Sequence, residues 1–253
     1  MSTAGRDALV AYLDELLETA AWSDKSLNGL QVEGAALVSK VALATDAAQA
    51  TIDMAVQAGA QFLIAHHGLF WGRVEPVTGP LRARLASLLR AEISLYVSHL
   101  PLDAHPEVGN NAVLARLLEL REIEPFGPWG SGSIGVMGRL PAALDRAGLA
   151  ARLEALLGER PHVLAFGPDA IARIAVVSGA AADLIPEAAH AAVDAFVTGE
   201  TSHTAVHQAR ERNLNVLFAG HYATETLGVR ALGDHLAERF GLETVFLDAP
   251  TGY

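Results

Sequence analysis

Cysteine is absent from all 253 residues of the chain. Its absence excludes disulfide bonds, thiolate nucleophiles and every zinc or iron site with sulfur ligands, so any metal ion must be bound by nitrogen and oxygen. Basic runs are also missing, and the net charge is -11. Phosphate contacts depend on clustered lysine and arginine, so this charge disfavours a nucleic-acid-binding protein without excluding a small cationic patch.

Membrane-spanning and several enzymatic signals are missing as well. No apolar run approaches the roughly 20 residues that cross a bilayer, and no basic segment followed by an apolar block opens the chain, so we expect a cytoplasmic protein without a membrane segment. Glycine-rich nucleotide-binding loops and the Gly-x-Ser-x-Gly turn of serine hydrolases are not found. Hydrophobic residues make up 51% of the chain, which is ample for one large or two small domains.

Apolar runs and helical periodicity alternate along most of the chain. This order predicts parallel strands joined by right-handed crossovers. Residues 22–34 are predicted to form an ordered loop, and Asn110 or Asn111 to cap a helix. The predicted helices cover residues 5–20, 47–58, 81–91, 110–120, 144–157, 202–212 and 224–240. The predicted strands cover residues 41–45, 61–65, 93–98, 162–165, 174–179, 195–198, 214–219 and 244–247.

The second half of the chain repeats the order of the first. Aligning residues 174–179 with 41–46 places residues 195–200 over 62–67 without a gap, and opposes Glu200 to His67. A repeated strand and helix order with polar groups at each strand end indicates internal duplication. We therefore predict an α/β fold of two similar, duplicated lobes with helices packed on mainly parallel sheets.

The boundary between the two lobes is predicted within residues 121–140, where glycine and proline are concentrated. The first lobe then covers residues 1–125 and the second covers residues 126–253.

Two adjacent histidines, His66 and His67, end a buried apolar strand. Adjacent side chains on a strand diverge, so these two can each bind one of two neighbouring ions. In open α/β sheets the carboxyl ends of the strands lie along one edge. We therefore expect a metal site between the lobes at the C-terminal ends of the strands. The donors predicted there are Asp46, His66, His67, His99, Asp103, Glu200, His203, His221 and Glu225.

His221 and Glu225 are four residues apart at a strand-to-helix turn. Both can point the same way if the helix starts early, and the two oxygens of Glu225 could then span two ions. A structural alternative is that Thr224 caps the helix while Glu225 interacts with its positive N-terminal end.

Two other donor pairs have structural alternatives as well. Asp103 follows His99 by four residues across Pro101, so it could be a metal ligand on a bent loop or a turn aspartate. His203 and His207 form a competing metal pair at helical spacing, although His207 is expected to point away from the strand end.

A set of imidazole and carboxylate donors suits two divalent ions such as zinc, iron, manganese or nickel. Two ions about 3.5 to 4 Å apart can share a hydroxide that is nucleophilic at neutral pH, so hydrolysis is the expected chemistry. Glu200, His99 or His203 would then move protons. Two alternatives stay open, namely a non-catalytic metal-dependent scaffold or binding protein and a purely structural metal ion.

Five segments together resemble the dinuclear-metal family of GTP cyclohydrolase I type 2 homologues. They are Asn-Gly-Leu-Gln-Val-Glu-Gly at 28–34, Ala-His-His-Gly-Leu-Phe-Trp at 65–71, His-Leu-Pro-Leu-Asp-Ala-His at 99–105, Thr-Gly-Glu at 198–200 and Gly-His-Tyr-Ala-Thr-Glu at 220–225. The match runs over essentially the whole chain and looks like the short form of the family, without an inserted domain.

The resemblance implies metal ligation by His66, His67, Asp103, His221 and Glu225, with Glu225 shared between the ions. It also implies a ring-shaped homohexamer whose sites face an internal cavity. Many members have His-Thr-Asn-Leu-Asp where this chain has His-Leu-Pro-Leu-Asp at 99–103. GTP cyclohydrolase I sites use cysteine ligands, which this chain lacks, so the expectation is a metal-dependent hydrolase whose small-molecule substrate is open.

Overall fold

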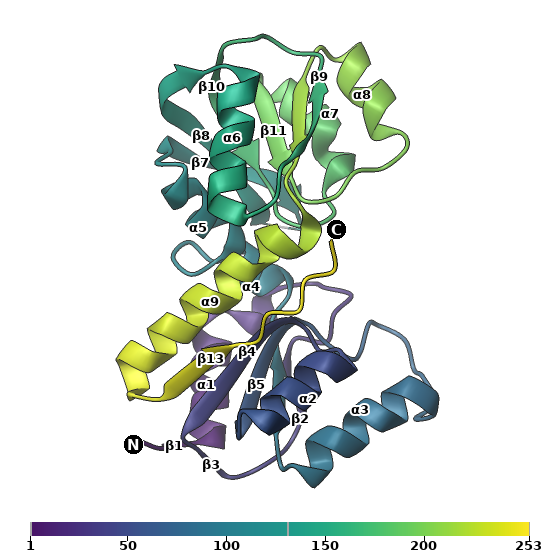
Figure 1. Ribbon diagram of the computed structural model, residues 1–253, viewed down its shortest axis with the longest axis vertical. Coiled ribbons are helices and arrows are strands. Elements are labelled where there is room, and N and C mark those ends of the chain that lie inside the picture. The colour runs from purple at the N-terminus through teal and green to yellow at the C-terminus, as the bar shows by residue number, and fades with distance from the viewer. Residues whose placement is uncertain (1, 131, 253) are drawn as a thin grey trace. The chain divides into compact units, whose positions relative to one another are not determined.

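The computed structural model describes residues 2–130 and 132–252. The chain divides into two compact units, and both are interrupted in sequence. Unit 1 comprises Met1–Leu102 and Gly228–Ala249, and unit 2 comprises Asp103–Leu227 and Pro250–Tyr253. The first boundary therefore lies at Leu102, not near residue 125 as predicted, and the C-terminal part of the chain returns to unit 1 (Figure 1).

The sheet of unit 1 has the order β13-β4-β5-β6-β2. Its first four strands are parallel, and β2 pairs antiparallel with β6. A two-stranded ribbon of β1 and β3 lies apart from this sheet. The elements that begin in unit 1 are β1 (Ala4–Gly5), α1 (Arg6–Leu16), the short 3-10 helix η1 (Thr19–Ala21), β2 (Gly29–Val32), β3 (Leu37–Val38), β4 (Lys40–Asp46), α2 (Gln49–Gln57), β5 (Phe62–His67), α3 (Gly79–Arg90), β6 (Ser94–Val97), α4 (Leu100–Ala104) and β13 (Glu243–Phe246).

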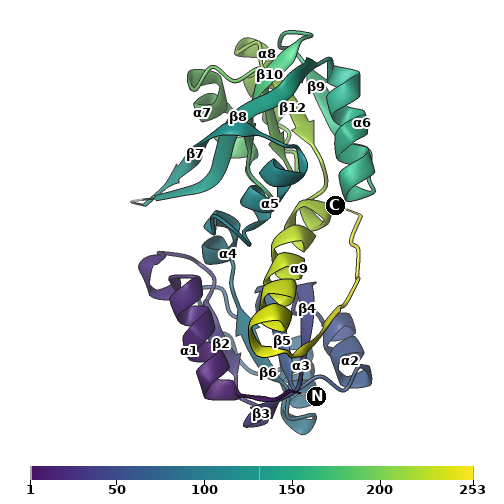
Figure 2. The ribbon, with the colours of Figure 1, turned by 90° about the vertical axis from the view of Figure 1, so that its left-hand side faces the viewer.

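Both faces of this sheet are buried, as expected for central parallel strands. On one face, Ile52 of α2 and Leu88 of α3 belong to the same apolar cluster as Leu63 of β5. On the other face, Tyr96 of β6 donates a hydrogen bond to Asp14 of α1 at 2.8 Å. Figure 2 shows α1 and α2 on opposite sides of the strands.

The sheet of unit 2 has the order β7-β8-β10-β11-β12-β9. The central strands β10, β11 and β12 are parallel, whereas β7, β8 and β9 pair antiparallel, so this sheet is mixed and not mainly parallel. Figure 2 shows α6 and α7 on opposite faces of it. The remaining elements are α5 (Asn110–Leu117), β7 (Arg121–Trp129), β8 (Gly132–Leu144), α6 (Arg146–Leu157), β9 (His162–Ala165), β10 (Ile171–Val176), the 3-10 helix η2 (Ala182–Leu184), α7 (Ile185–His190), β11 (Ala195–Thr198), α8 (Ala205–Glu211), β12 (Asn215–Phe218) and α9 (His221–Phe240).

The predicted α/β class and the repeated strand order are confirmed. The pairing register repeats as well, because Val41 lies opposite Phe62 in unit 1 and Ile174 lies opposite Ala195 in unit 2. Both pairs are 21 residues apart, which is the spacing that the ungapped alignment of the two halves requires.

Two local predictions were wrong. The stretch 121–140 does not contain the boundary between the units, because β7 and β8 of unit 2 form a long hairpin there. Neither Asn110 nor Asn111 caps α5, since Gly109 is the N-cap residue. Both asparagine side chains are buried and donate hydrogen bonds elsewhere. Among the described residues, no helix combines the length and the apolarity that a membrane span needs.

Candidate metal centre

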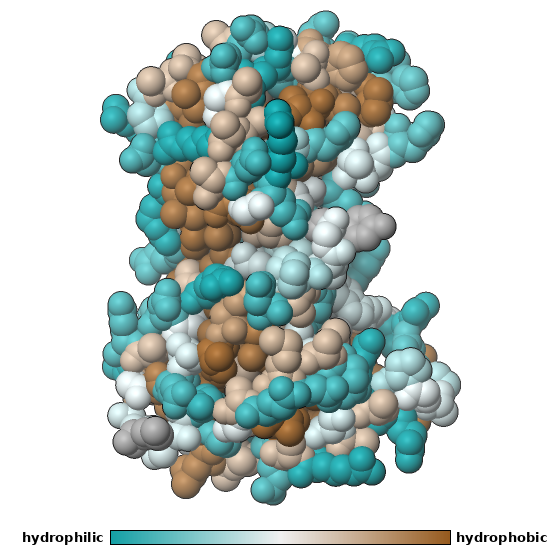
Figure 3. Space-filling view, in the orientation of Figure 1, coloured by the Kyte–Doolittle hydropathy of each residue, from teal (hydrophilic) through white to brown (hydrophobic). Residues whose placement is uncertain are grey.

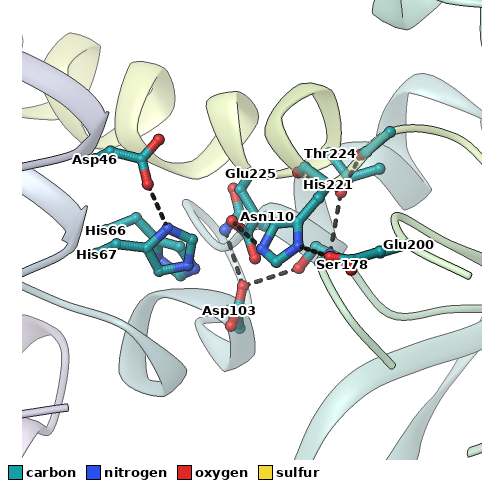
Figure 4. A network of polar contacts seen from close by, with 12 residues as sticks. Asp46, His66, His67, Asp103, Asn110, Ser178, Glu200, His221, Thr224 and Glu225 are labelled. Carbon is teal, nitrogen blue, oxygen red and sulfur yellow. Dashed lines mark hydrogen bonds and ion pairs between the residues drawn. The ribbon is translucent and has the colours of Figure 1, made fainter. Parts of the chain in front are cut away.

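His66 and His67 are the last two residues of β5, and their side chains take different partners. The Nδ1 atom of His66 lies 2.9 Å from the carbonyl oxygen of Ser98, and His66 is fully buried. The Nδ1 atom of His67 lies 2.9 Å from Oδ1 of Asp46 (Figure 4). A carbonyl and a carboxylate only accept, so Nδ1 carries the proton on both rings and Nε2 is the nitrogen that can coordinate a metal.

His99 follows β6 and brings a third imidazole to this place. Its ring centroid lies 5.0 Å from that of His66 and 5.6 Å from that of His67. One ligand atom of each of the three histidines lies within 4.8 Å of those of the other two. The Nδ1 atom of His99 lies 3.0 Å from Oδ2 of Asp24, so the same proton placement holds for this ring.

Asp24 is ionised at neutral pH despite its burial. Desolvation by itself would raise the pKa of this carboxyl group. Hydrogen bonds from His99, Asn28 and the backbone of Ser26 outweigh that effect and hold the pKa well below its usual range. Unit 1 therefore brings the rings of His66, His67 and His99 together, and two of these three rings lie against a carboxylate.

In unit 2, Asp103 lies in the short helix α4 and not on a bent loop. Pro101 is tolerated there because it falls in the first turn, where backbone N–H groups have no partner within the helix. Oδ1 of Asp103 accepts hydrogen bonds from Nδ2 of Asn110 and from Oγ of Ser178, both at 2.8 Å (Figure 4). These two donors fix a carboxylate that is only 7% exposed.

Helix α9 begins at His221, three residues before the predicted start at residue 224, so the condition under which His221 and Glu225 can point the same way is met. Nε2 of His221 lies 3.1 Å from Oε2 of Glu225, one helical turn later. Nδ1 of His221 donates to Oε2 of Glu200 at 2.7 Å (Figure 4). Glu225 is 3% exposed, so the imidazole lies between a buried carboxylate and a half-exposed one.

The two carboxylates change the protonation of His221. Burial alone would lower the pKa of this imidazole, but Glu225 and Glu200 outweigh the desolvation and raise its pKa to about 9. In the metal-free protein the additional proton on His221 therefore supplies the positive charge that the carboxylates of Glu225 and Glu200 attract. A divalent ion that binds here displaces this proton.

Two glycines after strands leave room for the start of α9. A Cβ atom added at Gly179, after β10, would collide with Oε1 of Glu225. A Cβ atom added at Gly199, after β11, would lie 2.7 Å from Cα of His221. Thr224 does not cap the helix, because its Oγ1 donates to the Gly220 carbonyl and accepts from the Gly179 amide at 3.1 Å.

The donor set fits first-row divalent ions. It contains imidazole nitrogen and carboxylate oxygen only, as a chain without cysteine requires. In each imidazole Nδ1 is hydrogen-bonded to an oxygen, so Nε2 is the nitrogen that could bind a metal ion. The same arrangement orients metal-binding histidines in other proteins. Buried histidine, aspartate and glutamate groups of this chain could therefore hold a metal ion.

Not every predicted donor has the expected place. The carboxylate of Asp46 contacts Nδ1 of His67, and that of Glu200 contacts Nδ1 of His221, so each carboxylate orients an imidazole. His203 and His207 are exposed with ring centroids 6.3 Å apart. Within the part of the chain that the structure describes, neither belongs to a group of three possible metal ligands.

Sequence reasoning missed the residues that hold the donors in place. These are Asp24, Asn110, Ser178, Gly179 and Gly199. A usable signal existed for the two glycines, because each lies shortly after a strand of the second repeat. No signal pointed to Asp24 beyond its place in the predicted loop.

Relatives match nearly the whole chain. A Deinococcus radiodurans protein called GTP cyclohydrolase 1 type 2 homolog is 45% identical over 248 residues, which cover 98% of this chain and 94% of the relative. A Pyrococcus horikoshii protein of the same name is 47% identical over 251 residues, which cover 98% of this chain and 99% of the relative. The family resemblance seen in the sequence is thereby confirmed.

A solved structure and a family model also match nearly the whole chain. A crystal structure of a Thermus thermophilus protein is 46% identical with a TM-score of 0.93, and the match covers 99% of this chain and 100% of that one. The family model of Duf34/NIF3 matches residues 4–252. The chain therefore belongs to the Duf34/NIF3 (NGG1p interacting factor 3) family.

Proposed function

We propose that this protein is a metal-dependent hydrolase with two divalent ions bound by His66, His67, Asp103, His221 and Glu225. The observation that carries the proposal is the hydrogen bonding of the three ligand imidazoles, each of which has its Nδ1 atom on an oxygen acceptor. Such contacts select the tautomer and the ring orientation that metal binding needs. The name GTP cyclohydrolase 1 type 2 homolog, carried by the relatives, agrees with hydrolytic chemistry.

When bound, two divalent ions supply Lewis acidity and make water nucleophilic at neutral pH. The protein's own groups then divide the remaining work. Glu225 has two oxygens and can serve both ions. Asp46 and Glu200 would orient His67 and His221, and the contact with His221 favours this supporting role for Glu200 over proton transfer. Of the two other proton-transfer candidates, the ring of His99 lies beside His66, whereas His203 is exposed on a turn.

The metal ligands are tested by elemental analysis of protein purified without added metal. We expect two divalent ions per chain in the wild type and a loss of metal in His66→Ala and in Glu225→Ala. His207→Ala is the matched control, because it removes an imidazole of the competing pair and should leave the metal content unchanged. Full metal content in both ligand variants, or a loss confined to His207→Ala, contradicts the proposal.

Hydrolysis is tested on the same protein with a panel of nucleotides, phosphoesters and cyclic amides. We expect turnover of at least one compound class by the metal-loaded wild type and none after chelation. Undiminished turnover in metal-free protein argues against a metal-dependent hydrolase. If no compound is turned over while metal binding persists and one partner is captured reproducibly, the protein is the metal-dependent scaffold considered above.

We further propose that the protein assembles as the ring-shaped homohexamer that the family resemblance implies. Exposed apolar surface supports assembly, since Leu117, Ile123 and Trp129 of unit 2 are each more than a third exposed. Figure 3 shows apolar surface over β7, β8 and α5. Light scattering should give about 160 kDa, which is six chains of 26.6 kDa, and a monomer mass at micromolar concentration would exclude the ring.

A further inference from the structure

The loop before β2 contains a buried carboxylate that the proposed metal ligands do not explain. The side chain of Asp24 is only 3% exposed. It accepts hydrogen bonds from the backbone amides of Ser26 at 3.0 Å and Leu100 at 3.1 Å, and from Nδ2 of Asn28 at 3.0 Å. Its remaining partner is Nδ1 of His99, at 3.0 Å. Every partner of this carboxylate is a donor, so the site is built for an ionised acceptor.

The same loop holds the backbone of His99. Oδ1 of Asn28 accepts a hydrogen bond from the His99 amide at 2.8 Å. His99 is thus fixed twice, through its backbone by Asn28 and through its ring by Asp24. A side chain with two such restraints has little rotational freedom, which a simple packing role does not require.

The loop also holds the turn after β5. Oε1 of Gln31 accepts a hydrogen bond from the Leu69 amide at 2.8 Å, and a Cβ atom added at Gly68 would collide with the Gln31 side chain. One segment, residues 24–31, therefore contacts the ends of both β5 and β6. These are the strand ends that carry His66, His67 and His99.

The contact with Asp24 decides which nitrogen of His99 carries the proton. A carboxylate cannot donate, so the proton lies on Nδ1 and the lone pair lies on Nε2. The ring of His99 contacts those of His66, His67 and Trp71, with centroid distances of 5.0, 5.6 and 5.2 Å. Its Nε2 lone pair is therefore available beside the proposed metal ligands.

We propose that Asp24 is a positioning residue that fixes the tautomer and the orientation of His99, and that Nε2 of His99 accepts a proton from the water that attacks the substrate. The second part rests on the proposed hydrolase function. In this step an O–H bond of water breaks and an Nε2–H bond forms. The resulting imidazolium is stabilised by the Asp24 carboxylate, and the proton is available for the leaving group.

The positioning role is tested without any substrate. In protein labelled with ¹⁵N at histidine, long-range ¹H–¹⁵N spectra at one neutral pH report the tautomer of each ring. We expect His99 to be protonated at Nδ1 in the wild type and to shift toward Nε2 protonation in Asp24→Asn, because the new amide can donate. Asp53→Asn, on the exposed side of α2, is the matched control and should leave the spectrum of His99 unchanged. An unchanged His99 tautomer in Asp24→Asn overturns the positioning role.

A second measurement separates a proton acceptor from a metal ligand and does not depend on the fold of the Asp24 variant. His99→Gln loaded with Zn²⁺ should keep the wild-type metal content, and the His99 signals of zinc-loaded wild type should show an unligated Nε2. Loss of zinc in His99→Gln, or zinc-shifted signals of His99, makes it a ligand and overturns the proton-acceptor role.

Turnover completes the test with the compound that the panel identifies. We expect kcat to fall at least about 100-fold in His99→Gln, as removal of a general base requires, with KM within about threefold of the wild type. A kcat unchanged in His99→Gln overturns the proton-acceptor role alone. A wild type that binds metal but hydrolyses nothing overturns the proposed hydrolase function and this role with it, while the tautomer spectra still decide the role of Asp24.

Discussion

Among the glycines near His221, namely Gly179, Gly199 and Gly220, Gly179 has the least room for a side chain. It adopts a φ of 66°, and an added Cβ would collide with Oε1 of Glu225. We predict that Gly179→Ala displaces this carboxylate and lowers the metal content measured by elemental analysis. Gly59→Ala is a matched control, because Gly59 has a φ of 67° and nothing within 4 Å of the added Cβ.

The left-handed backbone alone should cost each variant about 1 to 2 kcal/mol, since alanine is disfavoured in that region. Only Gly179→Ala should lose metal. Equal metal content in the two variants would mean that Glu225 moves aside without consequence or is not a ligand.

Asp24 gives a prediction for acid stability. The pKa of Asp24 is lowered in the folded protein. Its contribution to the free energy of unfolding is therefore present above pH 3.8, the pKa in the unfolded chain, and is lost as the pH falls below that value. Asp24→Asn should destabilise the protein by about 2 to 3 kcal/mol at neutral pH, because it removes hydrogen bonds to a charged group. Urea unfolding at pH 7 and near pH 3 should show this difference shrinking in acid. If the difference in unfolding free energy between the wild type and Asp24→Asn does not change with pH, the ionised carboxylate of Asp24 contributes nothing to stability.

The metal-ligand candidates at strand ends were predictable from the sequence, but the residues that hydrogen-bond to them and orient them were not. His66, His67 and His221 follow apolar runs, so their place at the sheet edge follows from strand periodicity. Asp24 comes from a loop 75 residues before His99, and only the folded chain brings the two together. A single sequence carries no local pattern for such a contact.

At the scale of elements, α9 fits β4 because residue 233 is glycine. A Cβ atom at this position would collide with Cδ1 of Leu43, which is 3% exposed. Glycine to alanine in a helix normally stabilises by about 1 kcal/mol. We predict the opposite sign for Gly233→Ala, a loss of about 1 to 3 kcal/mol from overpacking.

A double-mutant cycle measured by urea unfolding checks this steric explanation. Leu43→Ala alone should cost about 2 to 5 kcal/mol because it leaves a cavity. The added methyl of Gly233→Ala should partly fill that space, so the double variant should be less destabilised than the sum of the two. Strict additivity would show that Gly233 is required for another reason.

Elements with regular periodicity were predicted, whereas short or irregular ones were not. Helices α2, α3 and α6 lie within the predicted ranges or within two residues of them. Strand β2 was missed because it has four residues and pairs with β6 from a stretch rich in glycine and polar residues. Helix α4 was missed because it has only five residues and contains a proline, which in isolation favours a turn.

At the scale of the whole molecule, the division of the chain was the hardest feature to predict. The internal repeat correctly indicated two α/β units. The repeat does not reveal that β13, at the end of the sequence, pairs with β4 near its beginning. That pairing depends on a contact about 200 residues apart, and parallel strands require no local connection. Glycine and proline at 121–140 favoured a boundary between the lobes, but here they belong to a long irregular hairpin within unit 2.

Metal removal should lower the stability of the whole molecule. A ligand that binds only the folded protein stabilises it by RT ln(1 + [L]/Kd), which is about 2.7 kcal/mol at one hundred times Kd. We therefore predict that chelation lowers the Tm of the wild type by several degrees and that adding Zn²⁺ restores it. His66→Ala and Glu225→Ala should start near the chelated Tm and respond little to Zn²⁺, while His207→Ala should behave like the wild type. Complete loss of helical circular dichroism on chelation would instead identify a structural ion, because unfolding without metal is the behaviour of sites whose metal holds the fold together.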